Sequence, residues 1–161
     1  MPADVVLGWD IGGAHLKVAA VDRKDKVMQV LQLPCPLWLG LEHLDRAIST
    51  ALAQMPGASL HAVTMTGELT DFFRNRAQGV KTIIARFAKQ APVGRTYIYA
   101  GPEGFLTPEN AARKQTPWPR QTGRPARNWS RAFCRMHCSS ISAARPPIWF
   151  PSAAACSGFG G

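Results

Sequence analysis

A tight turn between two apolar runs near the start of the chain most constrains its fold. The segment reads VLGWDIGGAHLKVAAV and spans residues 6–21. Val5–Trp9 predicts a short buried strand, and Leu16–Val21 predicts a second strand that returns beside it. Because only a short turn containing Gly12 and Gly13 separates them, the two strands must pair antiparallel.

Further along the chain, apolar stretches alternate between the spacing of strands and the spacing of helices. Three more strands are predicted, at Val27–Leu33, Leu60–Met65 and Thr96–Ala100. Leu41–Met55 has the apolar periodicity of a helix, and Leu69–Gln90 is expected to be mostly helical, with Gly79 as a break. The order is therefore β-β-β-α-β-α-β. Since strand–helix–strand connections favour parallel neighbours, the sequence predicts an α/β fold with a mixed sheet and flanking helices.

The charge of the chain is divided unevenly along its length. Residues 1–112 hold 11 Lys and Arg and all 10 Asp and Glu, a net charge of +1, whereas residues 113–161 hold 8 Lys and Arg and no acid, a net charge of +8. A net charge of +9 usually indicates nucleic acid or an anionic surface as partner. The uneven division argues against both partners and predicts two units, a folded domain over residues 1–112 and a different kind of sequence over residues 113–161.

The residues at the start of the chain and the length of its apolar runs predict the cellular compartment. Asp4 and Asp10 interrupt the apolar start, so no secretory signal is recognised. No apolar run approaches the roughly 18 residues of a membrane span. A cytoplasmic protein without disulfides is expected.

The first turn offers the residue types of a phosphate and metal site. A carboxylate at the end of a buried strand, Asp10, can hold Mg²⁺ through water. Gly12 and Gly13 let backbone amides approach a phosphate, because no Cβ stands in the way, and Lys17 adds a positive charge from the next strand. An ordinary hairpin turn explains Asp and Gly equally well. The spacing excludes a Walker A loop and a dinucleotide fingerprint.

A second cluster, TMTGEL, follows the strand predicted at Leu60–Met65. Its candidate ligand-binding residues are Thr64, Thr66, Gly67 and Glu68. Ligands of α/β proteins commonly bind at such strand ends, so this cluster is expected to share a cleft with Asp10. The alternative is a helix start in which Thr66 is the N-cap and Glu68 lies in the first turn.

The remaining chemically versatile residues indicate no site of their own. His15, His43 and His61 lack the spacing of metal ligands and are interpreted as structural or surface residues. Cys35 stands between two prolines without an evident histidine partner, so a packed thiol is predicted. Trp38 is expected either in the core or in the wall of a cleft.

Three stretches, GWDIGGAHLKVAAVD, LPCPLWLGLEHL and HAVTMTGELTDFF, together resemble one family. It is the hydantoinase/oxoprolinase-like protein family of the tetrahydromethanopterin-linked one-carbon transfer pathway, and the resemblance covers about residues 5–112. It implies the first lobe of an actin-like ATPase, a ribonuclease-H-like fold, in which Asp10, Gly12 and Gly13 match the first phosphate loop.

The resemblance also implies an activity. Related archaeal proteins join a furan-methyl diphosphate to a tyramine-derived amine during methanofuran assembly and release diphosphate. A transferase that acts with Mg²⁺ on a small-molecule phosphate or diphosphate is therefore expected, without nucleic acid or membrane as partner. Alternatives are an ATP-dependent hydantoinase/oxoprolinase-like hydrolase, a sugar-kinase-like phosphotransferase, and, of another class, a basic-tailed module that binds RNA or a membrane. The use of ATP stays open.

The resemblance stops at about Lys114, and the later residues suggest a shifted reading frame. The family has a second phosphate loop, Asp-Ile-Gly-Ser-Thr-Thr-Thr-Asp, where this chain reads HCSSISAARPPIWF. Reading one base earlier forces Ala at Met136-His137 and Val at Trp149-Phe150. With permitted codons elsewhere, the stretch from Gln115 includes DIGSTTTD. A one-base deletion near codons 113–115 is therefore predicted, leaving a disordered tail and an inactive, truncated family member. The alternative is a genuine disordered basic arm.

Overall fold

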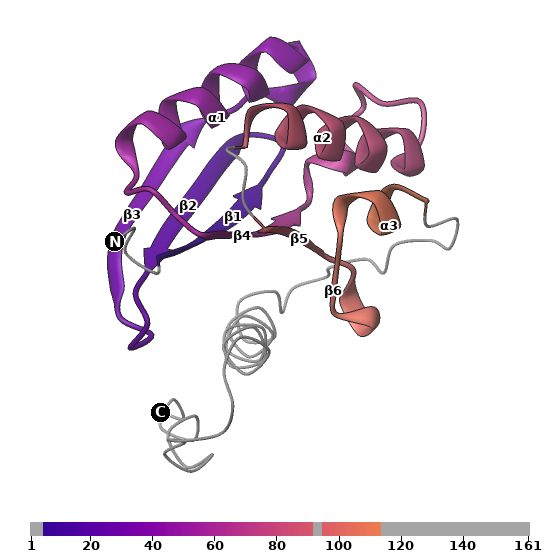
Figure 1. The fold of residues 1–161 in the computed structure, drawn as a ribbon. Helices are drawn as coiled ribbons and strands as arrows, with labels where there is room; N and C mark the ends of the chain where they lie inside the picture. Colours follow the sequence, from indigo (N-terminus) through magenta and orange to yellow (C-terminus); the bar gives the residue numbers. More distant parts are fainter. Residues whose placement is uncertain (1–4, 92–94, 114–161) are drawn as a thin grey trace, which may run out of the picture.

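The computed structural model describes residues 5–91 and 95–113, which form one mixed sheet with helices packed on it (Figure 1). The sheet has six strands in the order β3-β2-β1-β4-β5-β6. The strands are β1 (Val6–Ile11), β2 (His15–Val21), β3 (Val27–Pro34), β4 (Leu60–Met65), β5 (Arg95–Tyr99) and β6 (Phe105–Leu106). The helices are α1 (Leu41–Gln54), α2 (Arg76–Gln90) and α3 (Pro108–Arg113), with short 3₁₀ helices η1 (Leu37–Leu39), η2 (Gly67–Leu69) and η3 (Gly101–Glu103).

The strand pairing follows the predicted topology. β1 pairs antiparallel with β2, and β2 with β3, as short turns require. α1 leads from β3 to β4, which pairs parallel with β1 rather than with β3, and α2 leads from β4 to its parallel neighbour β5. The α/β fold class with a mixed sheet is confirmed. The strand β6 and the helix α3 extend it beyond the prediction.

The main core lies between one face of the sheet and the helices, where α1 and α2 run side by side (Figure 1). It includes Leu7, Trp9 and Ile11 of β1, Leu44 and Ile48 of α1, and Ile83 and Phe87 of α2. Strand alternation sends every second residue of β1 into this core. The intervening residues, Asp10 among them, therefore lie on the opposite face, where Val6, Val21, Leu60 and Ala62 form a smaller buried cluster.

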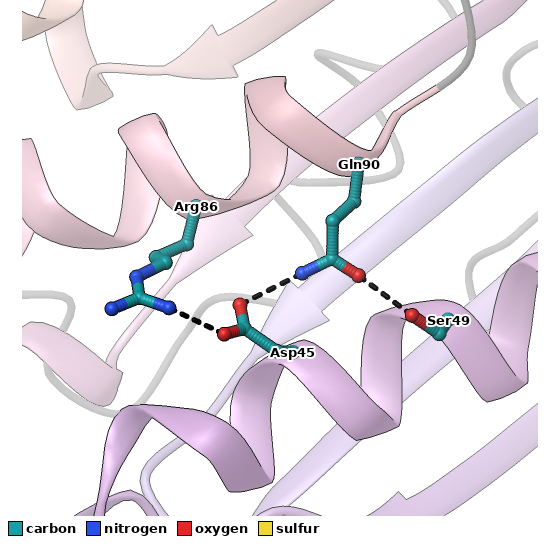
Figure 2. Close-up of polar contacts among 4 residues, drawn as sticks. All are labelled: Asp45, Ser49, Arg86 and Gln90. Atoms are coloured by element: carbon teal, nitrogen blue, oxygen red, sulfur yellow. Dashed lines mark hydrogen bonds and ion pairs between the residues drawn. The ribbon is translucent and has the colours of Figure 1, made fainter.

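A polar network fixes α1 against α2 at their outer side (Figure 2). Asp45 of α1 forms an ion pair with Arg86 of α2 and accepts a 2.8 Å hydrogen bond from Nε2 of Gln90. Oε1 of Gln90 in turn accepts from Oγ of Ser49 at 2.8 Å. Because each helix contributes residues four positions apart, one turn of α1 faces one turn of α2.

The helix predicted over Leu69–Gln90 starts later than expected. The prediction was wrong for residues 69–75, because α2 begins at Arg76. The side chain of Asn75 caps it by accepting from the Gln78 amide at 2.9 Å, while Oε1 of Gln78 accepts from the Arg74 amide at 3.0 Å. This reciprocal pattern resembles a capping box and sets where the helix begins.

Gly79 lies inside α2 and does not break it, contrary to the prediction. A Cβ at this position would stand 2.8 Å from the carbonyl oxygen of Glu68. The glycine therefore lets the helix backbone lie directly against η2.

Within residues 5–91 and 95–113, no helix combines the length and the apolar character that crossing a bilayer requires. The predictions for residues 114–161, including the shifted frame and the disordered tail, lie outside the described residues.

Candidate functional site

The two predicted clusters meet at the edge of the sheet where β1 and β4 end. These strands are parallel neighbours, so the turns that follow them leave the sheet at the same edge. The amide of Thr66 donates a 3.0 Å hydrogen bond to the carbonyl oxygen of Ile11. A Cβ on Gly67 would lie 3.2 Å from the carbonyl oxygens of both Ile11 and Gly12. The turn after β1 and the turn after β4 are thus in direct contact.

Three polar residues stand side by side across the neighbouring strands β2, β1 and β4. The pairing register places Asp10 opposite Lys17 on one side and opposite Thr64 on the other. Oδ2 of Asp10 lies 3.5 Å from Nζ of Lys17, and the two side chains are 37% and 55% exposed. Thr64 is buried. Asp10 was expected just after the strand, but it lies within β1, which extends to Ile11.

The glycines of the two turns are explained by close contacts. A Cβ on Gly13 would lie 2.6 Å from Cγ2 of Thr70, and a Cβ on Gly67 would lie 2.6 Å from Cδ1 of Leu37. Neither glycine has a positive φ. These positions therefore exclude larger residues because the turns approach each other, which is a structural reason that holds whether or not a ligand binds.

The backbone of the first turn leaves two amides available for an anion. The Gly12 amide is already used, because it donates to the carbonyl oxygen of His15 at 3.0 Å. The carbonyl groups of Gly13 and Ala14 accept from the amides of Leu37 and Cys35. Within residues 5–91 and 95–113, the amides of Gly13 and Ala14 donate none of the backbone hydrogen bonds of this turn. Two adjacent free amides beside Lys17 form a suitable place for a phosphate oxygen.

In the second turn, Thr66 has no role as a side-chain cap. Thr66 occupies the N-cap position of η2 and Glu68 lies in its first turn, as the alternative interpretation predicted, but the Thr66 side chain makes no capping hydrogen bond. The hydroxyl of Thr70 instead donates to the Gly67 carbonyl at 2.9 Å. Thr70, which the sequence reading overlooked, thereby stabilises the turn and also packs against Gly13. A Thr hydroxyl that donates to the carbonyl three residues earlier is a common local motif. This spacing is the signal in the sequence that could have identified Thr70.

Glu68 lies in the interior, with a side chain 2% exposed. Its Oε1 accepts from Nε and Nη2 of Arg76 at 3.1 and 2.9 Å. Burial raises the pKa of the Glu68 carboxyl, and the hydrogen bond from Arg76 opposes this rise. Oε2 is buried and meets no partner within the described part of the chain. A direct contact between Glu68 and a ligand stays a prediction.

The other singled-out residues divide between core and surface. His61 is fully buried and Cys35 is a buried free thiol, which confirms the structural interpretation of both. Burial raises the pKa of Cys35 to about 11. His15 is exposed, and His43 is partly exposed beside Glu42. Trp38 is 55% exposed and therefore lies outside the core, whereas its alternative place in the wall of a cleft stays a prediction.

The residues present suit a metal that is shared with a phosphate. No group of three His, Cys, Asp or Glu side chains comes together in residues 5–91 and 95–113. Asp10 is a single, partly exposed carboxylate. Mg²⁺ is often held by one or two carboxylates together with substrate phosphates, whereas a cage made only of protein groups is unusual for it. Asp10 therefore fits a Mg²⁺ ion that arrives with its phosphate ligand.

Comparison with known proteins gives one relative of low identity. The chain is 27% identical over 111 residues to the "(4-{4-[2-(gamma-L-glutamylamino)ethyl]phenoxymethyl}furan-2-yl)methanamine synthase" of Methanocaldococcus jannaschii, an alignment that covers 68% of this chain and 31% of the relative. The chain thus spans about a third of the length of this curated relative. No protein-family model matches the chain.

Two solved structures show limited similarity. One is a ROK family protein from Streptococcus pneumoniae in complex with sucrose, with a TM-score of 0.40 and 16% identity over 60% of this chain and 35% of that chain. The other is the Aquifex aeolicus member of the Ppx/GppA family, with a TM-score of 0.33 and 9% identity over 62% of this chain and 36% of that chain. Likenesses of this size carry no conclusion about what the chain does.

Proposed function

We propose that residues 5–113 form the phosphate-binding lobe of an actin-like enzyme of the hydantoinase/oxoprolinase-like family. In this proposal the protein is a transferase that acts with Mg²⁺ on a small-molecule diphosphate, as in methanofuran assembly. The row Lys17–Asp10–Thr64 beside the free amides of Gly13 and Ala14 carries the proposal. It supplies a cation, a metal-binding carboxylate, a hydroxyl and two amide donors at one edge of the sheet.

Each group has a distinct part in holding the ligand. The amides of Gly13 and Ala14 and the ammonium of Lys17 bind phosphate oxygens and offset their negative charge. The Asp10 carboxylate holds Mg²⁺, which neutralises charge on the departing diphosphate when it is bound. Thr64 is buried next to Asp10 and orients the Asp10 carboxylate. The result is a site that stabilises a diphosphate leaving group by electrostatic complementarity.

The likeness to the archaeal synthase supports this choice of reaction class. Its matched portion covers 111 residues, which is 68% of this chain. The amine acceptor and the second phosphate loop belong to the part of the proposal that lies outside residues 5–113. Sequencing the gene across codons 110–118 tests whether a one-base deletion separates this chain from that second loop.

Binding of pyrophosphate to the 161-residue chain tests the site itself. We expect amide signals of Gly13 and Ala14 to shift in an NMR titration with pyrophosphate and Mg²⁺, and to shift less when Mg²⁺ is chelated. Asp10→Asn and Lys17→Gln should each raise the dissociation constant about tenfold or more, since each removes a charged contact. A parallel titration with ATP and Mg²⁺ decides whether a nucleotide is accepted at the same turn.

The chain offers matched controls for both substitutions. Asp25→Asn and Lys24→Gln make the same chemical changes in the turn between β2 and β3, at the opposite end of β2 from His15. These variants should bind pyrophosphate like the wild type. The proposal fails if the wild type shows no shift at Gly13 and Ala14, or if the control variants lose as much affinity as Asp10→Asn.

A further inference from the structure

We infer that Glu68 is a positioning residue that holds the phosphate-binding turn in place through its buried ion pair with Arg76. Glu68 itself lies in η2, and the turn that it positions is the Gly12–Ala14 segment after β1. The inference rests on the proposed function, because it assigns a role toward the same site. The contacts that carry it run from α2 through η2 to Gly13.

The first contacts fix η2 to the start of α2. Arg76 is the first residue of α2, and its Nε and Nη2 both donate to Oε1 of Glu68. The backbone of Glu68 lies against Gly79, where a Cβ would stand 2.8 Å from the Glu68 carbonyl oxygen. A side-chain pair and a backbone contact thus act on one residue, so η2 cannot move independently of α2.

The next contacts carry that position to the phosphate-binding turn. Gly67 precedes Glu68, and a Cβ there would lie 3.2 Å from the Gly12 carbonyl oxygen. Thr70 follows η2, and a Cβ on Gly13 would lie only 2.6 Å from Cγ2 of Thr70. Because the segment around η2 meets Gly12 through the Gly67 backbone and Gly13 through the Thr70 side chain, we expect a displacement of η2 to displace Gly12 and Gly13 as well.

Stability alone does not account for an ion pair at this place. Removing a carboxylate from water is unfavourable, and replacing a buried ion pair with apolar residues is often neutral or stabilising. Moreover, Oε2 of Glu68 is buried without a partner among residues 5–91 and 95–113, which adds to the cost of keeping it. What the pair does provide is position, because two N–H groups of one guanidinium converge on Oε1 and hold it at the start of α2.

A matched pair of variants tests the inference on the 161-residue chain. Glu68→Gln keeps the size of the side chain and removes its charge. Asp45→Asn makes the equivalent change in the Asp45–Arg86 pair, which also joins α2 to a neighbouring element but lies outside the site (Figure 2). The measurements are urea unfolding, amide hydrogen exchange at Gly12 and Leu37, whose amides donate to the carbonyl oxygens of His15 and Gly13, and the dissociation constant for pyrophosphate with Mg²⁺.

We expect both variants to lose stability but only Glu68→Gln to disturb the turn. In Glu68→Gln, exchange at Gly12 and Leu37 should accelerate and pyrophosphate affinity should fall by about tenfold to a hundredfold, the usual range for residues that orient a binding group. Asp45→Asn should leave both readouts within about twofold of the wild type. If Glu68→Gln does not fold, Arg76→Lys keeps the charge but loses the fork, and it should produce the same changes to a smaller extent.

Two outcomes would overturn the inference, and both differ from failure of the proposed function. Unchanged exchange at Gly12 and Leu37 in a destabilised Glu68→Gln protein would show that the pair is only structural. Equal effects of Glu68→Gln and Asp45→Asn on exchange would show the same. If the wild type binds no pyrophosphate, the proposed function fails, whereas the exchange comparison still decides whether Glu68 positions the turn.

Discussion

Nε1 of Trp9 donates a 3.1 Å hydrogen bond to Nδ1 of His61, which joins β1 to β4 inside the core although 52 positions separate the two residues. Phe87 of α2 packs edge-on against both rings, with centroid distances of 5.0 Å to Trp9 and 6.1 Å to His61. Because Nδ1 accepts this hydrogen bond, the imidazole is neutral with its proton on Nε2. The folded core therefore selects one protonation state of His61.

The stability of the protein should fall in mild acid because of His61. Burial lowers the pKa of His61 from its ordinary 6.5, so below that pH the unfolded chain binds a proton that the folded chain does not. The contribution to stability is complete above pH 6.5 and is lost as the pH falls toward the folded-state pKa. Urea unfolding at a series of pH values from neutral to mildly acidic measures this slope.

Two histidine variants identify the source of that slope. His61→Gln removes the titrating ring while keeping an acceptor for Trp9, and it should flatten the pH dependence. His43→Gln removes a histidine on α1 outside this aromatic group and should leave the slope unchanged. A slope that persists in His61→Gln would assign the acid sensitivity to other groups.

Asp10 should matter little for stability. Its contact with Lys17 is a 3.5 Å pair between partly exposed side chains, and such pairs contribute about 0–1 kcal/mol. Asp10→Asn should therefore lower the free energy of unfolding by less than about 1 kcal/mol. At the neighbouring position, Trp9→Ala should lower the free energy of unfolding by about 3–5 kcal/mol, and it serves as the reference for the loss of a structural residue. A loss for Asp10→Asn as large as that for Trp9→Ala would mean that the carboxylate is structural.

Gly79→Ala should destabilise the protein although alanine is the better helix former. Helix propensity alone favours alanine by about 1 kcal/mol, but the new Cβ would stand 2.8 and 2.9 Å from backbone atoms of Glu68. We expect a net loss of about 1–3 kcal/mol from overpacking, measured by thermal or urea unfolding. Gly57→Ala is the control, since nothing lies within 4 Å of its Cβ position. It should be neutral or stabilising, and the same loss at both positions would refute the contact argument.

Cys35 should react slowly with alkylating reagents in the folded protein. With a pKa of about 11 and no exposed surface, its thiolate fraction at pH 8 is about one in a thousand. Iodoacetamide labelling followed by peptide mapping should show Cys35 modified far more slowly in the native chain than in urea. Equal rates under the two conditions would contradict the packed position.

Most of the fold could be predicted because its signals are local. The apolar alternation of β1 and β2 and the short turn at Gly12 and Gly13 are sufficient to give a hairpin. In each of the two strand–helix–strand units, the helix connects strands that run in the same direction. The start of α2 was missed because Leu69, Phe72 and Phe73 have helical spacing, although the capping residues Asn75 and Gln78 mark the true start.

The candidate site could be predicted only in part, because its geometry depends on distant segments. Strand order was enough to bring the turn that follows Asp10 into contact with Thr66 and Gly67. Nothing local indicated that Glu68 would turn inward to meet Arg76, since that contact depends on where α2 packs. The strand β6 was too short to show the alternation of a strand. For α3, Thr107 followed by Pro108 is a helix-start signal that was not used in the prediction.

The pairing of β1 on both sides also determines when the candidate site can come into existence during synthesis. β2 follows β1 directly, so the hairpin that contains Gly13 can form as soon as residue 21 is available. The other neighbour, β4, is made only after the whole of α1, and closing such a long connection is slow. Until Met65 has been added and paired, a growing chain therefore carries the first turn with no second turn to rest against.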